Sequence, residues 1–333
     1  MCKSRGILVD QCTKTRISGK MSTRKMKIIT TTINPAFDMH YEDFMPYKEN
    51  YVNSILISAG GKGINVSRTL KCNNIKNTAY VVLGSENAED FVSKLRQDGL
   101  DFKAIYCKGR IRENITIHTS GKSETRISLD SFALSEKVFD QLLRELFTVV
   151  DDQTILIFSG RLPRGISSDM AIRFLTKLRN RSGCRLVVDC NTFSLEELVL
   201  IKAWLIKPNE QEIEALIGEK INTIEQVINA AAKIAKAGIE NVIVSMGKDG
   251  AVAVAGDSKY QLVVPDITPL STVGAGDSMI AGFVGAYAQG ACIEECLKSA
   301  ALYGTSACLT QGTGSPTAID MKNIKDSINV VKI

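Results

Sequence analysis

Residues 271–279 combine two glycines with a carboxylate at the start of an apolar helix. They read Ser-Thr-Val-Gly-Ala-Gly-Asp-Ser-Met, and the apolar residues that follow predict the helix. Glycines at a helix N-terminus let successive backbone N–H groups converge on an anion, and the helix dipole adds to the attraction. Asp277 could then take a proton from an alcohol while the amides stabilise a phosphoryl group in transfer. The alternative is an ordinary first-turn acid that stabilises the helix.

A second glycine-rich stretch, residues 59–65, supplies other polar groups. It reads Ala-Gly-Gly-Lys-Gly-Ile-Asn, so Lys62 offers a cation and Asn65 an amide on the helix that follows. A tight turn into a helix is the simpler interpretation of this stretch. Asp38 follows Asn34-Pro35 and could equally be a turn or capping carboxylate.

Two common nucleotide-binding motifs are missing from the sequence. Met279 stands where a dinucleotide fingerprint would have its third glycine, and the chain has no GxxxxGK[ST] phosphate loop. Hydride transfer and P-loop chemistry therefore lose support.

The elements that must position these residues alternate between strand-like and helix-like segments. Such a βαβ rhythm predicts a doubly wound α/β fold, in which a mainly parallel sheet is flanked by helices on both faces. Ligands of such sheets bind beyond the carboxyl ends of the strands. The strand-like runs are residues 27–33, 79–83, 155–158, 185–188, 204–206, 241–244 and 261–267.

A small second sheet is expected outside this core. Residues 38–44 and 51–57 alternate apolar with polar side chains, as half-exposed antiparallel strands do. Residues 114–118 and 124–128 flank a Ser-Gly turn and predict a hairpin. Together they indicate an inserted β-sheet lid, made of segments at about 38–57 and 113–128, within a single domain of residues 26–333.

The charge distribution argues against nucleic-acid and membrane partners. The net charge is +5, but residues 1–25 contain seven Lys and Arg against Asp10 alone, which leaves −1 for the remaining chain. This basic leader lacks the apolar stretch of a secretory signal, so a disordered extension is favoured over an organelle presequence. No apolar run is long enough to span a bilayer. Nine scattered cysteines without a CxxC pair fit a reducing compartment, and we expect a cytoplasmic protein.

Five ordered motifs resemble those of the PfkB-type, ribokinase-like sugar kinases. The similarity covers about residues 26–320 and looks greatest to the 1-phosphofructokinase and tagatose-6-phosphate kinase branch. Each motif is weak alone, but their order and spacing together are specific. The motifs are residues 34–38, 59–65, 207–209 with Glu212, 245–250 and 272–278.

This resemblance implies a role for each matching residue. Asp277 would be the catalytic base, and the amides of Gly274, Ala275 and Gly276 would form the anion hole. Asn209 and Glu212 would help to hold Mg²⁺ and the nucleotide phosphates, with Glu212 acting through water. The sugar-phosphate site would comprise Asp38, Gly61, Lys62, Asn65, Arg112 and Asn114. The ATP site would comprise Lys207, Asn209, Ser245, Met246, Gly247, Lys248, Asp249, Gly250 and Gly276.

The implied reaction is ATP- and Mg²⁺-dependent phosphorylation of fructose 1-phosphate to fructose 1,6-bisphosphate. The alternative is phosphorylation of tagatose 6-phosphate to tagatose 1,6-bisphosphate, which uses the same kind of ketohexose monophosphate. The form of residues 271–279 favours the first. A catalytically idle sugar-phosphate or nucleotide-binding regulator is a third possibility, which the intact base and glycines disfavour. The resemblance also implies a homodimer formed through the β-lid.

One position departs from the family pattern. Arg161 stands in the segment Ser-Gly-Arg-Leu-Pro, where the family usually has a small serine. The arginine could face solvent at a loop edge or supply a second cation for the substrate phosphate. The sequence does not choose between these two roles.

Overall fold

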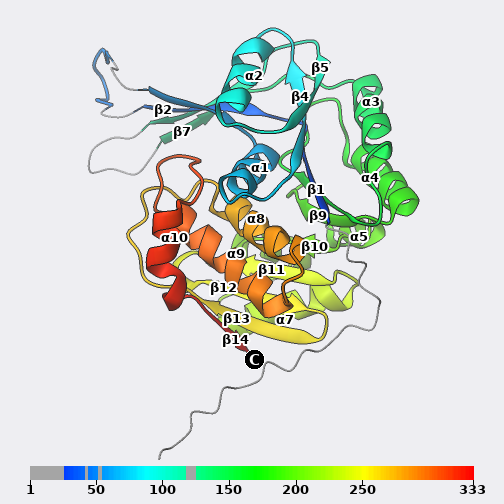
Figure 1. The fold of residues 1–333 in the computed structure, drawn as a ribbon, viewed down its shortest axis with the longest axis vertical. Helices are drawn as coiled ribbons and strands as arrows, with labels where there is room; N and C mark the ends of the chain where they lie inside the picture. The colour runs from blue at the N-terminus through cyan, green and yellow to red at the C-terminus, as the bar shows by residue number, and fades with distance from the viewer. Residues whose placement is uncertain (1–25, 42–43, 52–54, 118–124) are drawn as a thin grey trace, which may run out of the picture.

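The computed structural model describes residues 26–41, 44–51, 55–117 and 125–333. The basic leader and the tip of the expected hairpin lie outside these ranges. The largest element is a ten-stranded sheet in the order β14-β13-β12-β11-β10-β9-β8-β1-β4-β5 (Figure 1). Its strands are β1 (Lys27–Thr32), β4 (Thr78–Gly84), β5 (Phe102–Cys107), β8 (Thr154–Ser159), β9 (Arg185–Asp189), β10 (Leu205–Ile206), β11 (Asn241–Ser245), β12 (Ala251–Ala255), β13 (Ser258–Val263) and β14 (Asn329–Lys332).

The sheet is mainly parallel, as the sequence predicts. All neighbouring pairs from β5 to β11 are parallel, whereas β11, β12, β13 and β14 pair antiparallel along one edge. After β1 the chain continues to β4 on one side and later returns to β8 on the other. Open α/β sheets form a crevice where the strand order reverses in this way, beyond the carboxyl ends of the strands.

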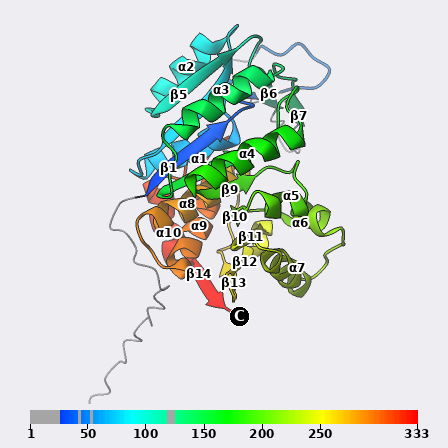
Figure 2. The ribbon, with the colours of Figure 1, turned by 90° about the vertical axis from the view of Figure 1, so that its right-hand side faces the viewer.

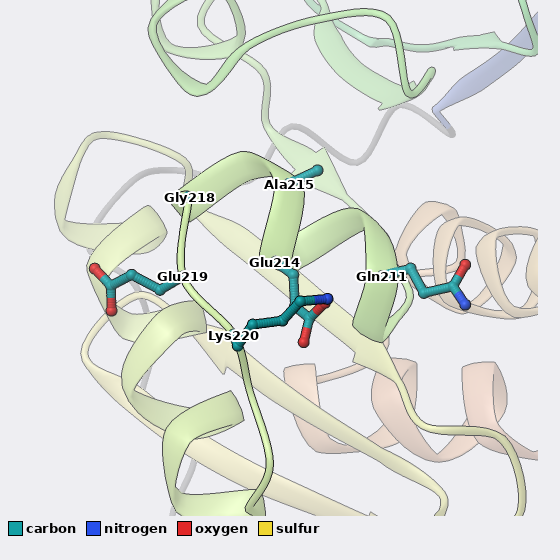
Figure 3. A pocket seen from close by; sticks show the side chains of 6 residues that line it. All are labelled: Gln211, Glu214, Ala215, Gly218, Glu219 and Lys220. Carbon is teal, nitrogen blue, oxygen red and sulfur yellow. The ribbon is translucent and has the colours of Figure 1, made fainter.

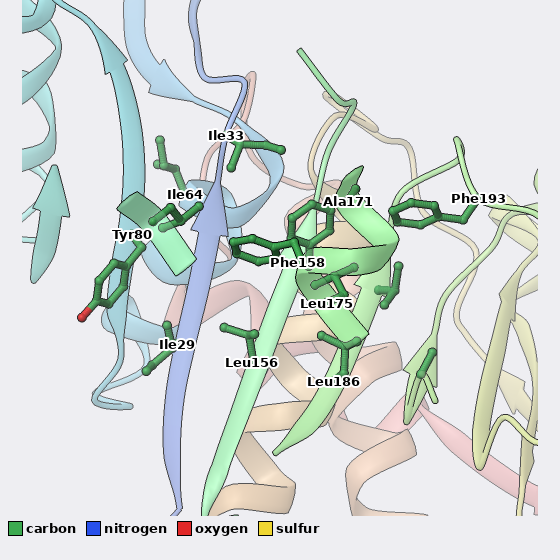
Figure 4. Close-up of a cluster of buried hydrophobic side chains, with 14 of the residues drawn as sticks. Ile29, Ile33, Ile64, Tyr80, Leu156, Phe158, Ala171, Leu175, Leu186 and Phe193 are labelled. Carbon is green, nitrogen blue, oxygen red and sulfur yellow. The ribbon is translucent and has the colours of Figure 1, made fainter. Parts of the chain in front are cut away.

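Helices cover both faces of this sheet (Figures 1 and 2). The side chains of β8 alternate between the faces: Ile155 and Ile157 join one buried cluster, and Leu156 and Phe158 join the other. Figure 4 shows the second cluster, where Phe158 lies with Leu175 and Ala171 of α4. One face carries chiefly α1 (Lys62–Cys72), α8 (Ala275–Ala288) and α9 (Ile293–Ala307); the other carries α2 (Ala88–Gln97), α3 (Glu136–Phe147), α4 (Ser168–Ser182), α5 (Leu195–Leu200), α6 (Glu210–Ile217) and α7 (Ile224–Lys236). The chain ends with α10 (Ala318–Ile324) and β14.

A four-stranded second sheet projects from one end of the molecule (Figure 1). Its order is β3-β2-β6-β7, with β2 (Ala36–Tyr41), β3 (Ile55–Gly60), β6 (Arg112–Ile117) and β7 (Thr125–Ser128). The central pair, β2 and β6, is parallel, and each pairs antiparallel with its outer neighbour. The chain crosses between this small sheet and the body four times, at residues 33–35, 61, 108–111 and 129–135.

Several strand boundaries differ from the sequence prediction; the strand expected over residues 38–44, for example, spans Ala36–Tyr41. The strand expected over residues 261–267 ends at Val263, since Pro265 follows and has no N–H to donate to a ladder. The strand expected to end at residue 57 continues to Gly60, because Ala59 and Gly60 pair with β2. Within the described ranges, no helix is long and apolar enough to cross a membrane.

Candidate active site

Asp277 lies buried in the first turn of α8, at the predicted helix start. Gly274 is the N-cap of this helix, with a left-handed φ of 78°, and no side chain of the cap accepts a hydrogen bond from the first-turn amides. Asp277 is 6% exposed, and its Oδ2 accepts a hydrogen bond of 2.8 Å from Asn65 Nδ2. Burial and the charge of Asp189 raise the pKa of Asp277 to about 7, against the opposing effects of Lys62, Asn65 and Lys207. A carboxyl group with such a pKa is suited to exchange a proton near neutral pH.

A hydrogen-bonded chain fixes the direction of the Asn65 amide. Arg68 Nη1 donates to Asn65 Oδ1 at 3.1 Å, which leaves the Asn65 amino group to donate to Asp277. Arg68 is itself held by Asp98, with Nη2 2.8 Å from Oδ2, and by the backbone carbonyl of Ala59. Arg68 and Asp98 were not anticipated from the sequence, because an Arg three residues after Asn65 on a helix looks like a surface residue.

Asp189 is a second buried carboxylate at this edge of the sheet. It ends β9, its side chain is 5% exposed, and its Oδ2 lies 3.0 Å from Lys62 Nζ. Burial alone would lower the pKa of Lys62, but Asp189, Asp277 and Glu212 together raise it. Sequence analysis missed Asp189, although an acid directly after a buried parallel strand is the signal that could have found it.

Lys207 reaches the start of α8 from the end of β10. A Cβ atom added to Gly276 would lie 2.7 Å from Lys207 Nζ, so this ammonium group covers the glycine. Lys207 is 6% exposed. A larger residue at this position would displace the Lys207 ammonium group from its place beside the helix N-terminus.

The expected nucleotide residues meet at the ends of β10 and β11. Asn209 is the N-cap of α6 and forms a capping box with Glu212, in which each side chain accepts a hydrogen bond of 2.9 Å from the other residue's backbone N–H. Ser245 N donates to Pro208 O at 3.0 Å, which places the 245–250 loop beside Asn209. In that loop Met246 and Gly250 are buried, whereas Gly247, Lys248 and Asp249 are exposed.

A further group of predicted residues lies on the small sheet. Asn114 Nδ2 donates to Asp38 Oδ1 at 2.8 Å, and Arg112 Nη1 donates to Asn114 Oδ1 at 3.0 Å. Asp38 is therefore a β2 side chain and neither a turn nor a capping carboxylate. Burial raises its pKa. A Cβ atom on Gly60 would lie 2.0 Å from Asp38 Oδ2, so a glycine is needed beside this carboxylate.

Arg161 lies near Arg112, on the loop after β8. Arg161 is exposed, but its charge contributes, after burial, to a lowered pKa of Arg112, while Asp38 opposes that effect. Two cations held within electrostatic reach of one another favour an anion between them. Arg161 is thus within electrostatic reach of Arg112, whichever of its two expected roles the residue performs.

Several buried polar atoms around this crevice have no hydrogen-bond partner among the described residues. They come from the end of β1 and the segment after it, the end of β8 and the small sheet, where a ligand crevice is expected for such a strand order. Buried polar groups are normally paired, so unpaired ones gathered in one place suit a polar ligand. They are Thr32 Oγ1, Asn34 Oδ1, Arg112 Nε and Ser159 Oγ.

A depression of about 430 Å³ on the surface of α6 is a different feature (Figure 3). Its charged side chains are already engaged: Lys220 pairs with Glu214 at 2.7 Å, and Glu219 pairs with Lys233 at 2.8 Å. None of the predicted site residues lines it. Over the described ranges, no three His, Cys, Asp or Glu side chains are grouped to hold a metal ion.

The fold and the site together have the features of an enzyme that transfers a phosphoryl group to an alcohol. A ribokinase-like α/β sheet carries, at its strand ends, a helix N-terminus with a buried carboxylate and two lysines, next to a small second sheet. Positioning and charge neutralisation of this kind are what phosphoryl transfer to an alcohol requires.

Comparison with known proteins identifies the family. The family model described as pfkB family carbohydrate kinase matches residues 31–320, and the chain belongs to this family of kinases. A 1-phosphofructokinase of Borreliella burgdorferi is 33% identical over 85% of this chain and 92% of its own length. The ATP-dependent 6-phosphofructokinase isozyme 2 of Escherichia coli is 30% identical over 86% of this chain and 94% of its own. The crystal structure of phosphofructokinase-2 from E. coli in complex with substrates and products is similar, with a TM-score of 0.83, 28% identity, and coverage of 90% of this chain and 99% of that one.

Proposed function

We propose that this kinase phosphorylates fructose 1-phosphate with ATP and Mg²⁺, giving fructose 1,6-bisphosphate and ADP. The observation that carries the proposal is the buried Asp277 carboxyl at the N-terminus of α8, with a pKa raised to about 7. Curated relatives named 1-phosphofructokinase support the choice of sugar.

In the proposed mechanism, Asp277 accepts the proton of the sugar hydroxyl as its oxygen attacks the γ-phosphorus. Asn65 holds one oxygen of the carboxylate, so the other remains available for that proton. The amides of Gly274, Ala275 and Gly276, with Lys207 above Gly276, stabilise the negative charge of the phosphoryl group in transfer. The bond from that phosphorus to the β-phosphate oxygen breaks, and ADP leaves.

The remaining site residues bind the two substrates. We assign Asp38 and Asn114 to the sugar hydroxyls, and the cations Arg112 and Lys62 to its phosphate, because both cations border the same crevice. Gly61 allows the close approach of the backbone there. The nucleotide lies against Lys207, Asn209 and the 245–250 loop, which comprises Ser245, Met246, Gly247, Lys248, Asp249 and Gly250.

The residues near the nucleotide fit a magnesium ion held largely by phosphates and water. Glu212 uses one carboxylate oxygen in its capping box, which leaves the second for a metal-bound water. Its charge also acts on Lys62, so it faces the site. Mg²⁺ usually takes one or two carboxylates plus substrate phosphates, and so does not require a protein cage. When bound, it neutralises charge on the phosphates.

The first test replaces Asp277 by Asn, which keeps the shape but removes the proton acceptor. Turnover should fall by about 10²–10⁴-fold, as expected for loss of a general base, while binding of the sugar phosphate persists. Near-normal turnover would eliminate Asp277 as the base.

The second test compares kcat/KM for fructose 1-phosphate, fructose 6-phosphate, tagatose 6-phosphate and free fructose. Fructose 6-phosphate is the second candidate substrate, because a relative named 6-phosphofructokinase is nearly as similar as those named 1-phosphofructokinase. We expect the highest value for fructose 1-phosphate. A preference for another sugar phosphate would change the substrate and keep the mechanism. A preference for free fructose would also remove the phosphate-binding role of Lys62 and Arg112.

We also propose a homodimer in which a second copy of the chain covers the small sheet. Leu56 of β3, Ile127 of β7 and the adjoining Leu129 are 48%, 43% and 45% exposed. The strand register places Leu56 on the face that carries Asp38, and Ile127 and Leu129 on the opposite face. Exposed apolar side chains on a small sheet are normally covered. Light scattering at micromolar concentration should give twice the monomer mass, and L56K with I127K should lower it. A monomeric mass for the unsubstituted protein would exclude the dimer.

A further inference from the structure

Asp189 is a buried carboxylate to which the proposed reaction gives no task. Its side chain is 5% exposed, and Lys62 Nζ lies 3.0 Å from its Oδ2. Ionised groups are costly to bury unless they are paired. The chain retains this one at the end of β9, within electrostatic reach of Asp277.

The charged groups around Asp277 come from three separate elements. Lys62 and the neutral Asn65 belong to α1, Asp189 ends β9, and Lys207 follows β10. Lys62 is thus shared between two carboxylates, but its ion pair is made with Asp189. Asp277 receives only the hydrogen bond from Asn65 among its described side-chain contacts.

We propose that Asp189 is a positioning residue, which anchors the Lys62 ammonium at the end of β9 and so keeps Asp277 able to accept a proton. Without this anchor, Lys62 would turn to the remaining carboxylate and pair with it directly. A carboxylate in a direct ion pair is a weaker base. The inference rests on the proposed role of Asp277, and it assigns the ion pair of Asp189 to the control of that base.

Removing the anchor and removing the cation should have opposite effects. In Asp189→Asn, a negative charge is lost and Lys62 is released toward Asp277, so the pKa of Asp277 should fall. In Lys62→Met, the negative Asp189 remains without its cation, so the pKa of Asp277 should rise. An opposite charge within about 4–6 Å shifts a carboxyl pKa by about one to three units. The two variants should therefore differ by more than about one unit.

The experiment follows the proton of Asp277 in two ways on the full chain. The pH dependence of kcat/KM gives the pKa of the base in the free enzyme. Carbonyl ¹³C NMR of protein labelled in aspartate, with Asp277→Asn to assign the signal, gives the same titration without turnover. The matched control is Asp151→Asn, which breaks the exposed ion pair of Asp151 with Lys27 at 2.6 Å and should leave both measurements unchanged.

The expected result is a lower inflection in Asp189→Asn and a higher one in Lys62→Met. Asp189→Asn should also lose kcat, because a weaker base accepts the proton less readily, and its KM for sugar phosphate should rise as Lys62 leaves its place. An unchanged titration of Asp277 in Asp189→Asn, with activity merely reduced, would overturn the proposal. If Asp189→Asn does not fold, Lys62→Met decides: an inflection that does not rise also overturns it. Full activity of Asp277→Asn would instead reject the proposed base, so the two failures are distinguishable.

Discussion

Replacing Asp277 by Asn should stabilise the protein while it lowers turnover. Burial raises the pKa of this carboxyl from its ordinary 3.8 to about 7. A rise of about three units means that the ionised form costs the folded protein about 4 kcal/mol relative to the unfolded chain. Asn has nearly the same shape and no charge, so the variant avoids this cost. The hydrogen bond with Asn65, at 2.8 Å, can be kept through the Asn side-chain oxygen.

The stability that Asp277→Asn gains over the unsubstituted protein should increase as pH rises. Between about pH 4 and pH 7 the folded protein keeps a proton on Asp277 that the unfolded chain has released. The free energy of unfolding of the unsubstituted protein therefore falls as pH rises through this window, by about 1.4 kcal/mol per unit from this group alone. Above about pH 7 Asp277 is ionised in both the folded and the unfolded protein, and this group lowers the free energy of unfolding no further.

Urea denaturation of both proteins from about pH 5 to about pH 8.5 measures this effect. The difference in free energy of unfolding, variant minus unsubstituted, should grow by about 3 kcal/mol and then become constant. Titrating groups that do not interact with Asp277 cancel in that difference. A difference independent of pH, or a variant less stable at about pH 8, would refute the idea that the fold holds this carboxyl where its charge is disfavoured.

Three further substitutions test the geometry of the site. Gly276→Ala places a Cβ atom 2.7 Å from Lys207 Nζ, so kcat should fall by about 10²-fold, the order that one preorganised charge-stabilising contact is worth, with little change in urea midpoint; an unchanged kcat would contradict it. Gly60→Ala pushes its Cβ atom against Asp38, and KM for the sugar phosphate should rise by about 10-fold while KM for ATP, the internal control, stays constant. Arg161→Ser should raise KM for the sugar phosphate by about 10-fold if the arginine binds the phosphate, since a charged hydrogen bond contributes about 1.5–3 kcal/mol; no change would mark it as a solvent-facing residue.

Local sequence pattern is sufficient to predict most of the body of this fold. Strand β8 is buried at every position because both of its faces are covered, and the sequence shows this as the continuous apolar run 155–158. The four strands of the small sheet were predicted from the alternation of apolar and polar residues and, for β6 and β7, from the Ser-Gly turn between them. In the antiparallel edge, β13 was predicted in part, but β12 and β14 were not, because short strands with small residues, such as the Ala-Val-Ala-Val-Ala of β12, have no distinctive period.

The candidate site was predictable where a glycine or a motif marks a loop, and not where a side chain acts from within an element. Lys62, Asn65 and Asp277 were found because glycines stand beside them. Asp189 and Arg68 were missed, since the partner of each is fixed by the three-dimensional packing of α1 and β9. Long-range pairings such as Lys62 with Asp189 depend on strand order, which one sequence does not reveal.

The small sheet is joined to the body through the four connecting segments described above, at residues 33–35, 61, 108–111 and 129–135. Asp38 and Asn114 belong to the small sheet, whereas Lys62 and Asn65 belong to α1 of the body. The connection between the two is Gly61, whose φ of 125° few other residues tolerate. A tilt of the small sheet about these connecting segments would change the distance between Asp38 and Lys62. The hydrogen bond between Asn65 and Asp277 would stay intact, because both residues belong to helices of the body. A ligand that contacts both the small sheet and α1 would fix the orientation of the small sheet relative to the body. A ligand that contacts only one of them would leave that orientation unconstrained. Inhibitors designed to contact both Asp38 and Lys62 should therefore hold the enzyme in one conformation.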